Sequence, residues 1–198
     1  MPRTRALRGL AALLLGLAGL LARLAQAGAP QPEPAAAIDP ALAATAPRLS
    51  AASAVLMDAT TGAVLYGYRM HQRRDPASTT KIMTALLALE YGRLGDPVTV
   101  SRRAASTPGS RMGLRAGETY TLADLLAGLL LESGNDAAVA IAEHIAGSEE
   151  AFVALMNRRA QELGLRHTRF ANAHGLTAPG HYSSAYDLAI LARKAAAS

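Results

Sequence analysis

The chain has 198 residues, with 20 basic and 15 acidic side chains, a formal net charge of +5 and 51% hydrophobic residues. That composition excludes a disordered or collagen-like chain. Because there is no cysteine, it also excludes a disulfide-stapled mini-protein, a thiol nucleophile, a cysteine-ligated zinc ion and an iron–sulfur cluster.

The first 27 residues have the layout of a secretory signal peptide. Three arginines precede residues 9–22, a run of 14 apolar or small residues, and a small-x-small tripeptide ends at Ala27. The run is short for a membrane span, which needs about 20 apolar residues. We therefore expect cleavage after Ala27 and export to the periplasm or the outer face of the cytoplasmic membrane. An uncleaved N-terminal anchor is the alternative, since Arg23 is a mild stop signal.

Most of the charge excess belongs to this segment. Residues 1–27 hold four arginines and no acid, which leaves 16 basic and 15 acidic residues in the rest of the chain. We therefore expect no nucleic-acid partner. Half of the 10 prolines lie in residues 28–48, which predicts a semi-rigid Pro/Ala-rich linker. One folded domain is then expected over residues 49–198.

Within that domain, the sequence predicts a short hairpin followed by mostly helix. Apolar runs at 54–57 and 63–66 flank a Gly-terminated turn. Helical periodicity and stop signals then predict helices from Ser78 to Gly92, over 122–131 after a Thr121 cap, over 135–145 before Gly147, from Ser148 to Gly164, and from a capping-box-like Ser184 onward. Residues 166–182 are expected to be a loop. The expected core residues are Leu86, Leu89, Leu125, Leu129 and Ile141.

A Ser-x-x-Lys pattern opens the first predicted helix. Only two of the 20 basic residues are lysines, and Lys81 lies three residues after Ser78. Residues three apart share a helix face, so the Lys81 amine can reach the Ser78 hydroxyl. The helix N-terminus disfavours a charged lysine, and a lysine, unlike an arginine, can act as a base. The pattern favours a Ser–Lys nucleophile pair; the alternative is a Ser78 N-cap followed by a solvated Lys81.

A second pattern, Ser133-Gly134-Asn135, falls at the break between two predicted helices. A tight turn there would present a hydroxyl and an amide from an otherwise buried helix pair. Taken alone, the pattern favours helix capping, with Gly134 ending one helix and Asn135 capping the next.

Together, the two patterns resemble the active-site motifs of penicillin-binding proteins and serine β-lactamases. Roughly residues 50–195 look like the serine D-alanyl-D-alanine carboxypeptidases, the low-molecular-mass penicillin-binding proteins. The resemblance implies an α+β fold in which a hairpin of the sheet precedes a mostly helical region. The stretches that carry it, beyond the hairpin and the two motifs, are 113–118, 129–138, 172–176 and 180–184.

The same resemblance implies roles for four residues. Ser78 would be the acylated nucleophile, Lys81 its general base, Ser133 a proton relay toward the leaving group, and Asn135 a ligand of the substrate's peptide amide. Ser78 would attack the penultimate D-Ala of a peptidoglycan stem peptide, terminal D-Ala would leave, and water would hydrolyse the acyl-enzyme. β-Lactams would acylate the same serine. No cofactor is implied.

Two other functions remain open. A class A β-lactamase needs a downstream carboxylate for deacylation, but no Asp or Glu lies between Glu162 and Asp187, and the second motif is not Ser-Asp-Asn. A non-catalytic peptidoglycan-binding homologue is the other alternative, against which the intact motifs argue.

The histidines do not predict a metal site. His167, His174 and His181 are seven residues apart, but Gly175, Pro179 and Gly180 would break any helix that aligned them. We expect His174 and His181 to hydrogen-bond the loop that supports the site. His71 and His144 are expected at the surface.

The resembled family also needs a Lys-Thr-Gly motif on a strand beside the nucleophile. The sequence contains none, because its last lysine, Lys194, precedes two alanines. We therefore expect an incomplete sheet that exposes an apolar face of the hairpin. Residues 28–198 alone are expected to be poorly soluble and inactive, with a reading frame that continues past Ser198. A membrane anchor there is a further possibility that the resemblance raises.

Overall fold

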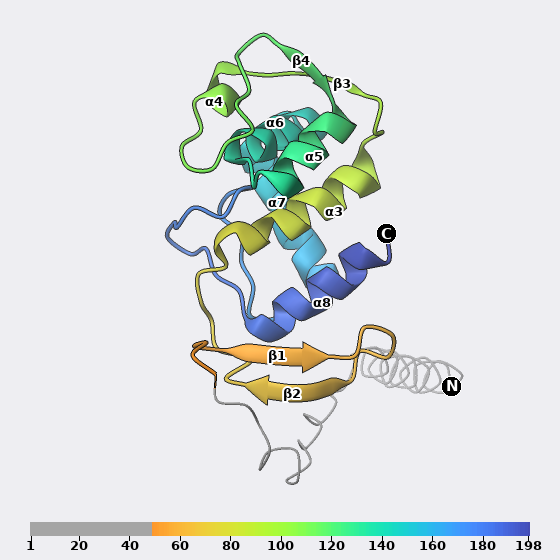
Figure 1. The fold of residues 1–198 in the computed structure, drawn as a ribbon, viewed down its shortest axis with the longest axis vertical. Helices are drawn as coiled ribbons and strands as arrows, with labels where there is room; N and C mark the ends of the chain where they lie inside the picture. Colours follow the sequence, from red (N-terminus) through yellow and green to blue (C-terminus); the bar gives the residue numbers. More distant parts are fainter. Residues whose placement is uncertain (1–48) are drawn as a thin grey trace, which may run out of the picture. The chain divides into compact units, whose positions relative to one another are not determined.

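One central helix, α3 (Lys81–Tyr91), organises residues 49–198, the part of the chain that the computed structural model describes. Figure 1 shows the other long helices around it. They are α5 (Leu122–Leu131), α6 (Asn135–Ala146), α7 (Glu149–Glu162) and α8 (Ala185–Ala196), and each contacts α3. The predicted α+β class, with a hairpin before a mostly helical region, is confirmed.

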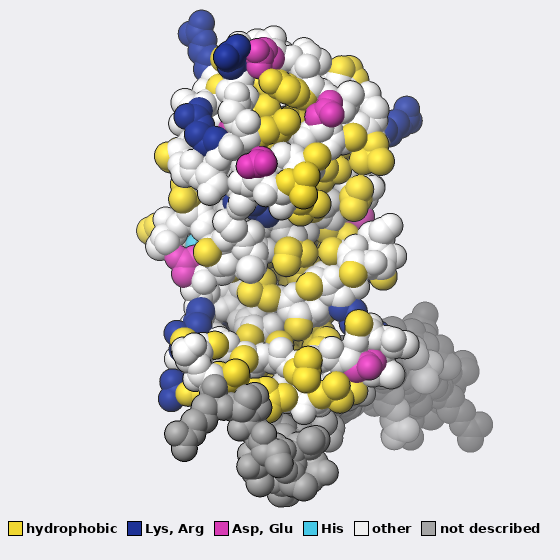
Figure 2. Space-filling view, in the orientation of Figure 1, with side chains coloured by type: hydrophobic (Ala, Val, Ile, Leu, Met, Phe, Trp, Pro, Cys, Tyr) yellow, Lys and Arg dark blue, Asp and Glu magenta, His cyan; other side chains and the backbone are white. Residues whose placement is uncertain are grey.

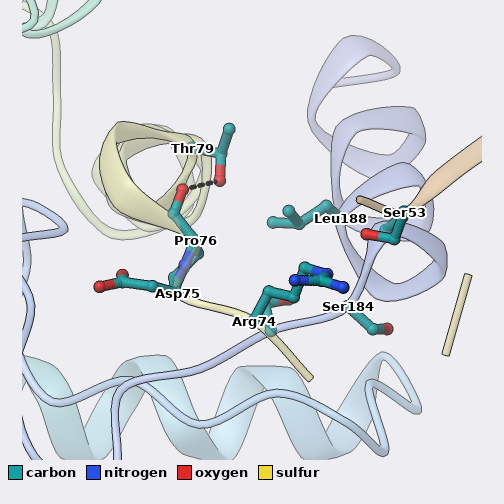
Figure 3. Close-up of a pocket in the computed structure, with 9 residues that line it drawn as sticks. Ser53, Arg74, Asp75, Pro76, Thr79, Ser184 and Leu188 are labelled. Carbon is teal, nitrogen blue, oxygen red and sulfur yellow. Dashed lines mark hydrogen bonds between the residues drawn. The ribbon is translucent and has the colours of Figure 1, made fainter. Parts of the chain in front are cut away.

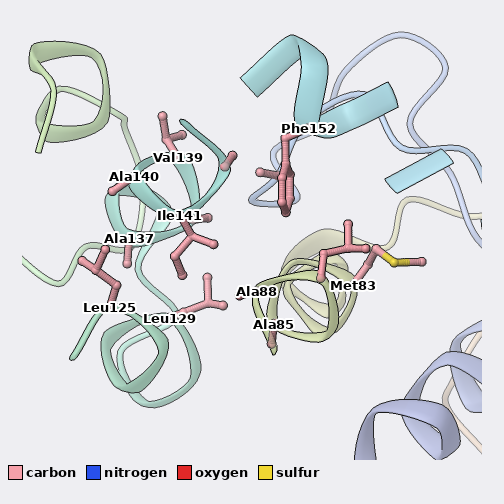
Figure 4. Close-up of a cluster of buried hydrophobic side chains, with 14 of the residues drawn as sticks. Met83, Ala85, Ala88, Leu125, Leu129, Ala137, Val139, Ala140, Ile141 and Phe152 are labelled. Atoms are coloured by element: carbon pink, nitrogen blue, oxygen red, sulfur yellow. The ribbon is translucent and has the colours of Figure 1, made fainter. Parts of the chain in front are cut away.

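The core lies where α3 meets α5, α6 and α7. Leu86 and Ile141 are fully buried there, and Phe152 of α7 reaches in from the side, as Figure 4 shows. The inner face of α6 consists largely of alanines, whose small side chains let the neighbouring helices approach closely. The expectation that Leu89 belongs to this core is wrong, because it is 46% exposed near the C-terminal end of α3.

The predicted helix boundaries follow from their capping residues. Thr121 forms a full capping box with Asp124 at the start of α5, and Gly147 ends α6 in the left-handed conformation, φ +80°. The box expected at α8 is only half formed. The Ser184 hydroxyl accepts from the Asp187 N–H, whereas the Asp187 carboxylate turns away to accept from the N–H of His167 and the hydroxyl of Thr168.

The hairpin consists of β1 (Ala54–Met57) and β2 (Val64–Tyr68), paired antiparallel with an irregularity at Leu56/Met57. Helix α8 lies between this hairpin and α3 (Figure 1). Arg193 of α8 fastens the hairpin turn, since its guanidinium donates to the carbonyls of Ala59 and Thr60 at 2.8 Å each. The hairpin therefore has a fixed position against the helices.

Apolar side chains remain exposed on this two-stranded sheet. Leu56 is 56% and Leu65 is 48% exposed. Figure 2 shows hydrophobic side chains over the hairpin and again over the helices above it. Within the described residues, the sheet is thus as small as expected and leaves an apolar face open to solvent.

Three short elements between α3 and α5 were not predicted from the sequence. These are β3 (Pro97–Thr99), α4 (Arg102–Ala105) and β4 (Thr119–Thr121); β3 and β4 pair antiparallel. Elements of three or four residues are too short to show a hydrophobic period. Their positions come instead from tertiary contacts, such as the burial of Val98 and Val100 in the core.

The predicted signal peptide over 1–27 and linker over 28–48 lie outside the described residues. Between residues 49 and 198, no helix has the length and apolarity that crossing a membrane requires.

A matched pair of leucines on α3 tests this description of the core. Leu86→Ala removes a fully buried side chain, so it should lower the free energy of unfolding by about 2–5 kcal/mol. Leu89→Ala removes a half-exposed one and should cost less than about 1 kcal/mol. Urea unfolding of the full-length gene product, followed by circular dichroism, measures both. Equal losses would contradict the observed orientation of α3.

Candidate active site

Ser78 lies on a tight turn just before α3 rather than in its first turn. The turn is a 3-10 helix, η1 (Ala77–Thr80), and α3 begins at Lys81. The Ser78 hydroxyl caps neither helix, and the residue is exposed. Ala77 before it has a φ of +46°, in the left-handed region that non-glycine residues seldom occupy. The turn therefore presents Ser78 to solvent at the start of a helix.

Lys81 is buried beneath this turn. It is only 3% exposed, and its ammonium group meets three oxygen acceptors. The Nζ atom is 3.3 Å from Ser78 Oγ, 2.7 Å from Asn135 Oδ1 and 2.7 Å from the carbonyl oxygen of His174. The alternative interpretation, a capping serine with a solvated lysine, is wrong.

Burial also changes the acid–base behaviour of Lys81. Removal from water penalises the charged form and lowers the pKa of Lys81 to about 8 from 10.5. When Lys81 loses a proton, its two remaining N–H groups can still donate to Asn135 and His174. The lone pair then faces the Ser78 hydroxyl. The geometry is that of a base beside a nucleophile.

Gly175 packs directly against the turn that carries Ser78. It has a φ of +96°, and a Cβ at this position would collide with the carbonyl of Ala77. Only glycine meets both requirements, the left-handed backbone and the close approach. The loop between α7 and α8 thus supports the Ser78 turn from one side, while His174 in the same loop holds Lys81.

The structure brings Asn135 into the site. The residue is the first of α6, and its side chain accepts from Lys81 and donates from Nδ2 to the carbonyl of Pro108 at 2.7 Å. Gly134, not Asn135, is the N-cap of α6, so the capping interpretation of this motif is wrong. Each amide nitrogen carries two hydrogens, which leaves one Nδ2–H for a further acceptor.

Ser133 lies in the turn between α5 and α6, with a φ of +54°. Among residues 49–198, its hydroxyl forms no hydrogen bond within the standard distance. The left-handed backbone turns the chain sharply just before Asn135. The family resemblance implied a site role for Ser133, and the structure places the residue two positions before Asn135, the amide that binds Lys81.

Asp136 is a supporting residue that the sequence analysis did not single out. It is fully buried, and its carboxylate accepts from the N–H groups of Met112, Gly113, Leu114 and Ala137 at 2.9–3.0 Å. Burial raises the pKa of Asp136, but the four N–H donors outweigh it and lower the pKa overall. The carboxylate therefore fixes the 112–114 segment onto α6 next to Asn135.

His174 and His181 both hydrogen-bond the loop that supports the site, as expected. His181 is buried; its Nδ1 accepts from the N–H of Ala171, and its Nε2 lies 2.9 Å from the Thr80 hydroxyl. His174 Nδ1 accepts from the Leu176 N–H at 3.2 Å. Burial lowers the pKa of both histidines. No cluster of three or more metal-ligating side chains occurs within residues 49–198.

A pocket of about 210 Å³ lies beside the turn that carries Ser78, and Ser78 does not line it. Figure 3 shows Pro76 and Thr79 of the turn on one side and Leu188 of α8 on another, with Arg74 between them. Neither Ser78 nor Lys81 lines this pocket. The chemistry described above therefore belongs to the exposed face of the turn, not to this pocket.

Comparisons with known proteins identify similar sequences and structures. A family model described as D-alanyl-D-alanine carboxypeptidase matches residues 41–198. The chain is 52% identical over 149 residues to D-alanyl-D-alanine carboxypeptidase DacF of Bacillus subtilis (strain 168), a match that covers 73% of this chain and 38% of that protein. It is 46% identical over 158 residues to DacD of Escherichia coli (strain K12), covering 74% and 41%.

Solved structures show the same likeness. Penicillin binding protein 5 of Haemophilus influenzae is 41% identical with a TM-score of 0.71, over 75% of this chain and 45% of that one. Penicillin binding protein 6B of Escherichia coli is 45% identical with a TM-score of 0.72, over 75% and 50%. The chain spans about two fifths of the length of the two curated relatives above.

Two glycines of the same loop test the contact behind Ser78. Gly175→Ala combines a left-handed backbone with a collision against the Ala77 carbonyl, so it should cost about 2–5 kcal/mol of unfolding free energy. Gly180→Ala has a similar φ of +78°, but its Cβ would meet only the flexible end of Arg169 at 3.1 Å. It should cost about 1–2 kcal/mol. Urea unfolding of the full-length gene product compares them, and equal costs would argue against the close packing.

Proposed function

This chain belongs to the D-alanyl-D-alanine carboxypeptidase family. We propose that the full-length gene product is an exported serine carboxypeptidase that acts on peptidoglycan. It removes the terminal D-Ala from stem peptides that end in D-Ala-D-Ala, and penicillin acylates it at the same serine. One observation carries the proposal: the buried Lys81 amine, 3.3 Å from Ser78 Oγ, has a pKa lowered to about 8.

Lys81 acts as the general base. With a pKa of about 8, about a tenth of the lysine is neutral at pH 7, against about 0.03% for a pKa of 10.5. Neutral Lys81 takes the proton from Ser78, whose Oγ attacks the carbonyl carbon of the penultimate D-Ala. The N–H of Ser78 at the start of the turn supports the developing oxyanion. The base is therefore available without any conformational change.

The rest of the reaction is acyl transfer to water. The C–N bond breaks, and the nitrogen of the departing D-Ala receives a proton through Ser133. Asn135 donates its remaining Nδ2–H to the substrate's peptide carbonyl while its oxygen stays on Lys81. Water then attacks the Ser78 ester, which releases the shortened peptide and returns the proton to the serine.

The sequence contains no Lys-Thr-Gly, the motif that in this family holds the substrate's terminal carboxylate. Because the chain also spans only part of its relatives' length, the tests below use the full-length gene product.

Export is the second part of the proposal. The basic start, the apolar run over 9–22 and the tripeptide ending at Ala27 support it. The mature protein would begin at Gly28, continue through the linker of residues 28–48 and reach the cell wall, where its substrate lies. N-terminal sequencing of the secreted protein tests the site of cleavage.

Covalent labelling tests the nucleophile and the base. Mass spectrometry after incubation with benzylpenicillin should find one adduct on the Ser78 peptide, and D-Ala should be released from a peptide that ends in D-Ala-D-Ala. Ser78→Ala should abolish both. Lys81→Arg should lower the labelling rate at least about 100-fold, because a permanent cation cannot accept the proton.

The matched control is Lys194→Arg, the same substitution at the other lysine of the sequence, which should label at the normal rate. An adduct in the Ser78→Ala protein, or a fully active Lys81→Arg protein, would refute the assignment.

The lowered pKa of Lys81 also predicts the pH dependence of acylation. Only the neutral amine is a base, and burial favours that form, so the acylation rate should rise with pH and reach half of its plateau near pH 8. Below that point it should fall about tenfold per pH unit. The rate of labelling by a fluorescent penicillin between pH 5 and pH 10 measures this. A rate that still rises about tenfold per pH unit up to pH 10 would show that burial does not lower the pKa of Lys81.

A further inference from the structure

A buried carboxylate lies behind the loop that holds Lys81. Glu149, the first residue of α7, is 8% exposed. One carboxylate oxygen accepts from the Arg103 guanidinium at 2.7 Å. The other accepts from the backbone N–H of Ala173 at 3.1 Å and lies 3.5 Å from His174 Nε2. Both oxygens of Glu149 are thus engaged with the protein.

The loop segment that Glu149 contacts includes the carbonyl that accepts a hydrogen bond from Lys81. Ala173 receives the Glu149 contact at its N–H, and the next residue, His174, offers its carbonyl to Lys81 Nζ at 2.7 Å. Ala173 is also bound to α3, because its carbonyl accepts from the buried hydroxyl of Thr84 at 2.6 Å. The Ala173–His174 segment therefore links the Glu149 carboxylate to the carbonyl that binds Lys81.

The imidazole of His174 completes the connection. Its Nδ1 accepts from the Leu176 N–H, so in the neutral ring the proton is on Nε2, the atom that faces Glu149. Burial lowers the pKa of His174, and Glu149 partly opposes that effect, whereas the charges of Lys81 and Arg103 reinforce it. The remaining titratable groups nearby are His181, which lowers the pKa of His174, and Asp75, which acts on His181.

We propose that Glu149 is a positioning residue for Lys81, the base that activates Ser78. Through Ala173 and His174, Glu149 holds the carbonyl that binds the Lys81 amine. It thereby fixes the position of the amine and how strongly the amine binds its proton. The inference rests on the proposed function, since it assigns Lys81 the role of base. We assign Glu149 no role in activating water: it is 8% exposed, and its two oxygens already accept from Arg103 and from the Ala173 N–H.

Removal of the carboxylate should change Lys81 in a defined direction. A carbonyl that accepts from the ammonium stabilises the charged form, so losing that acceptor lowers the pKa of Lys81 further. The loss of one hydrogen bond should lower the pKa of Lys81 by about half a unit to one unit. The amine is also less well oriented toward Ser78, which should lower the limiting acylation rate about tenfold or more.

The test compares Glu149→Ala with Glu150→Ala in the full-length gene product. Glu150 is the matched control, because it pairs with the same Arg103 at 2.7 Å but is exposed and forms no hydrogen bond with the loop within the described residues. Two measurements are made on each protein. NMR of ε-13C-labelled lysine gives the pKa of Lys81 without any substrate, with the signal assigned by its loss in Lys81→Met. Labelling by fluorescent penicillin gives the pH profile of acylation.

We expect Glu149→Ala to lower the Lys81 pKa and to shift the acylation midpoint to lower pH together, with a limiting rate reduced about tenfold or more. Glu150→Ala should leave both where they are in the unmodified protein. A purely structural role would scale the rate equally at every pH and leave both midpoints unmoved. That result would overturn the proposal.

Two further outcomes remain decisive. If Glu149→Ala does not fold, Glu149→Asp replaces it; this variant keeps the charge beside Arg103 but withdraws the carboxylate from Ala173, and it should give smaller shifts in the same direction. No shift in that variant would overturn the proposal.

If penicillin does not acylate the unmodified protein, the proposed function fails. The NMR titration still decides whether Glu149 controls the pKa of Lys81.

Discussion

The burial of one amine, that of Lys81, is the constraint on which the rest of the site depends. A lysine side chain that is 3% exposed must either find acceptors for its protons or lose its charge. Here the protein supplies acceptors for the ammonium group and also lowers the pKa of Lys81. It supplies two acceptors at 2.7 Å, from Asn135 and His174, and it leaves the third direction to Ser78 at a longer 3.3 Å. The weakest of the three contacts is thus the one through which a proton would have to move.

Each acceptor of Lys81 is itself held by buried polar groups. Asn135 stands at the start of α6, next to Asp136, whose carboxylate collects four backbone N–H donors from α6 and the 112–114 segment. The loop that carries the His174 carbonyl is held at two points. Glu149 accepts from the N–H of Ala173 just before it, and Gly175 just after it packs against the turn that carries Ser78. The site is therefore assembled from segments far apart in sequence, and the two buried carboxylates act by fixing backbone rather than by touching the amine.

Local patterns predicted the parts of this arrangement that local chemistry determines. The capping threonine before α5, the glycine after α6 and the spacing of Ser78 and Lys81 all act within a few residues, so the sequence shows them directly. Leu89 was misplaced because helical periodicity identifies a face but not where a neighbouring helix stops covering it. Glu149 and Asp136 were missed because a buried carboxylate is visible only when the donors around it, distant in sequence, are in place.

The position of Glu149 also bears on what separates a carboxypeptidase from a β-lactamase. No carboxylate lies between Glu162 and Asp187 in the sequence, but Glu149, upstream of both, lies 3.5 Å from His174 Nε2. A carboxylate that activates water must reach that water, whereas Glu149 is 8% exposed and accepts from Arg103 with one oxygen and from the Ala173 N–H with the other. Glu149 therefore holds the loop whose His174 carbonyl binds Lys81. Under the proposed function, this arrangement favours a slowly hydrolysed penicillin adduct over rapid β-lactam turnover.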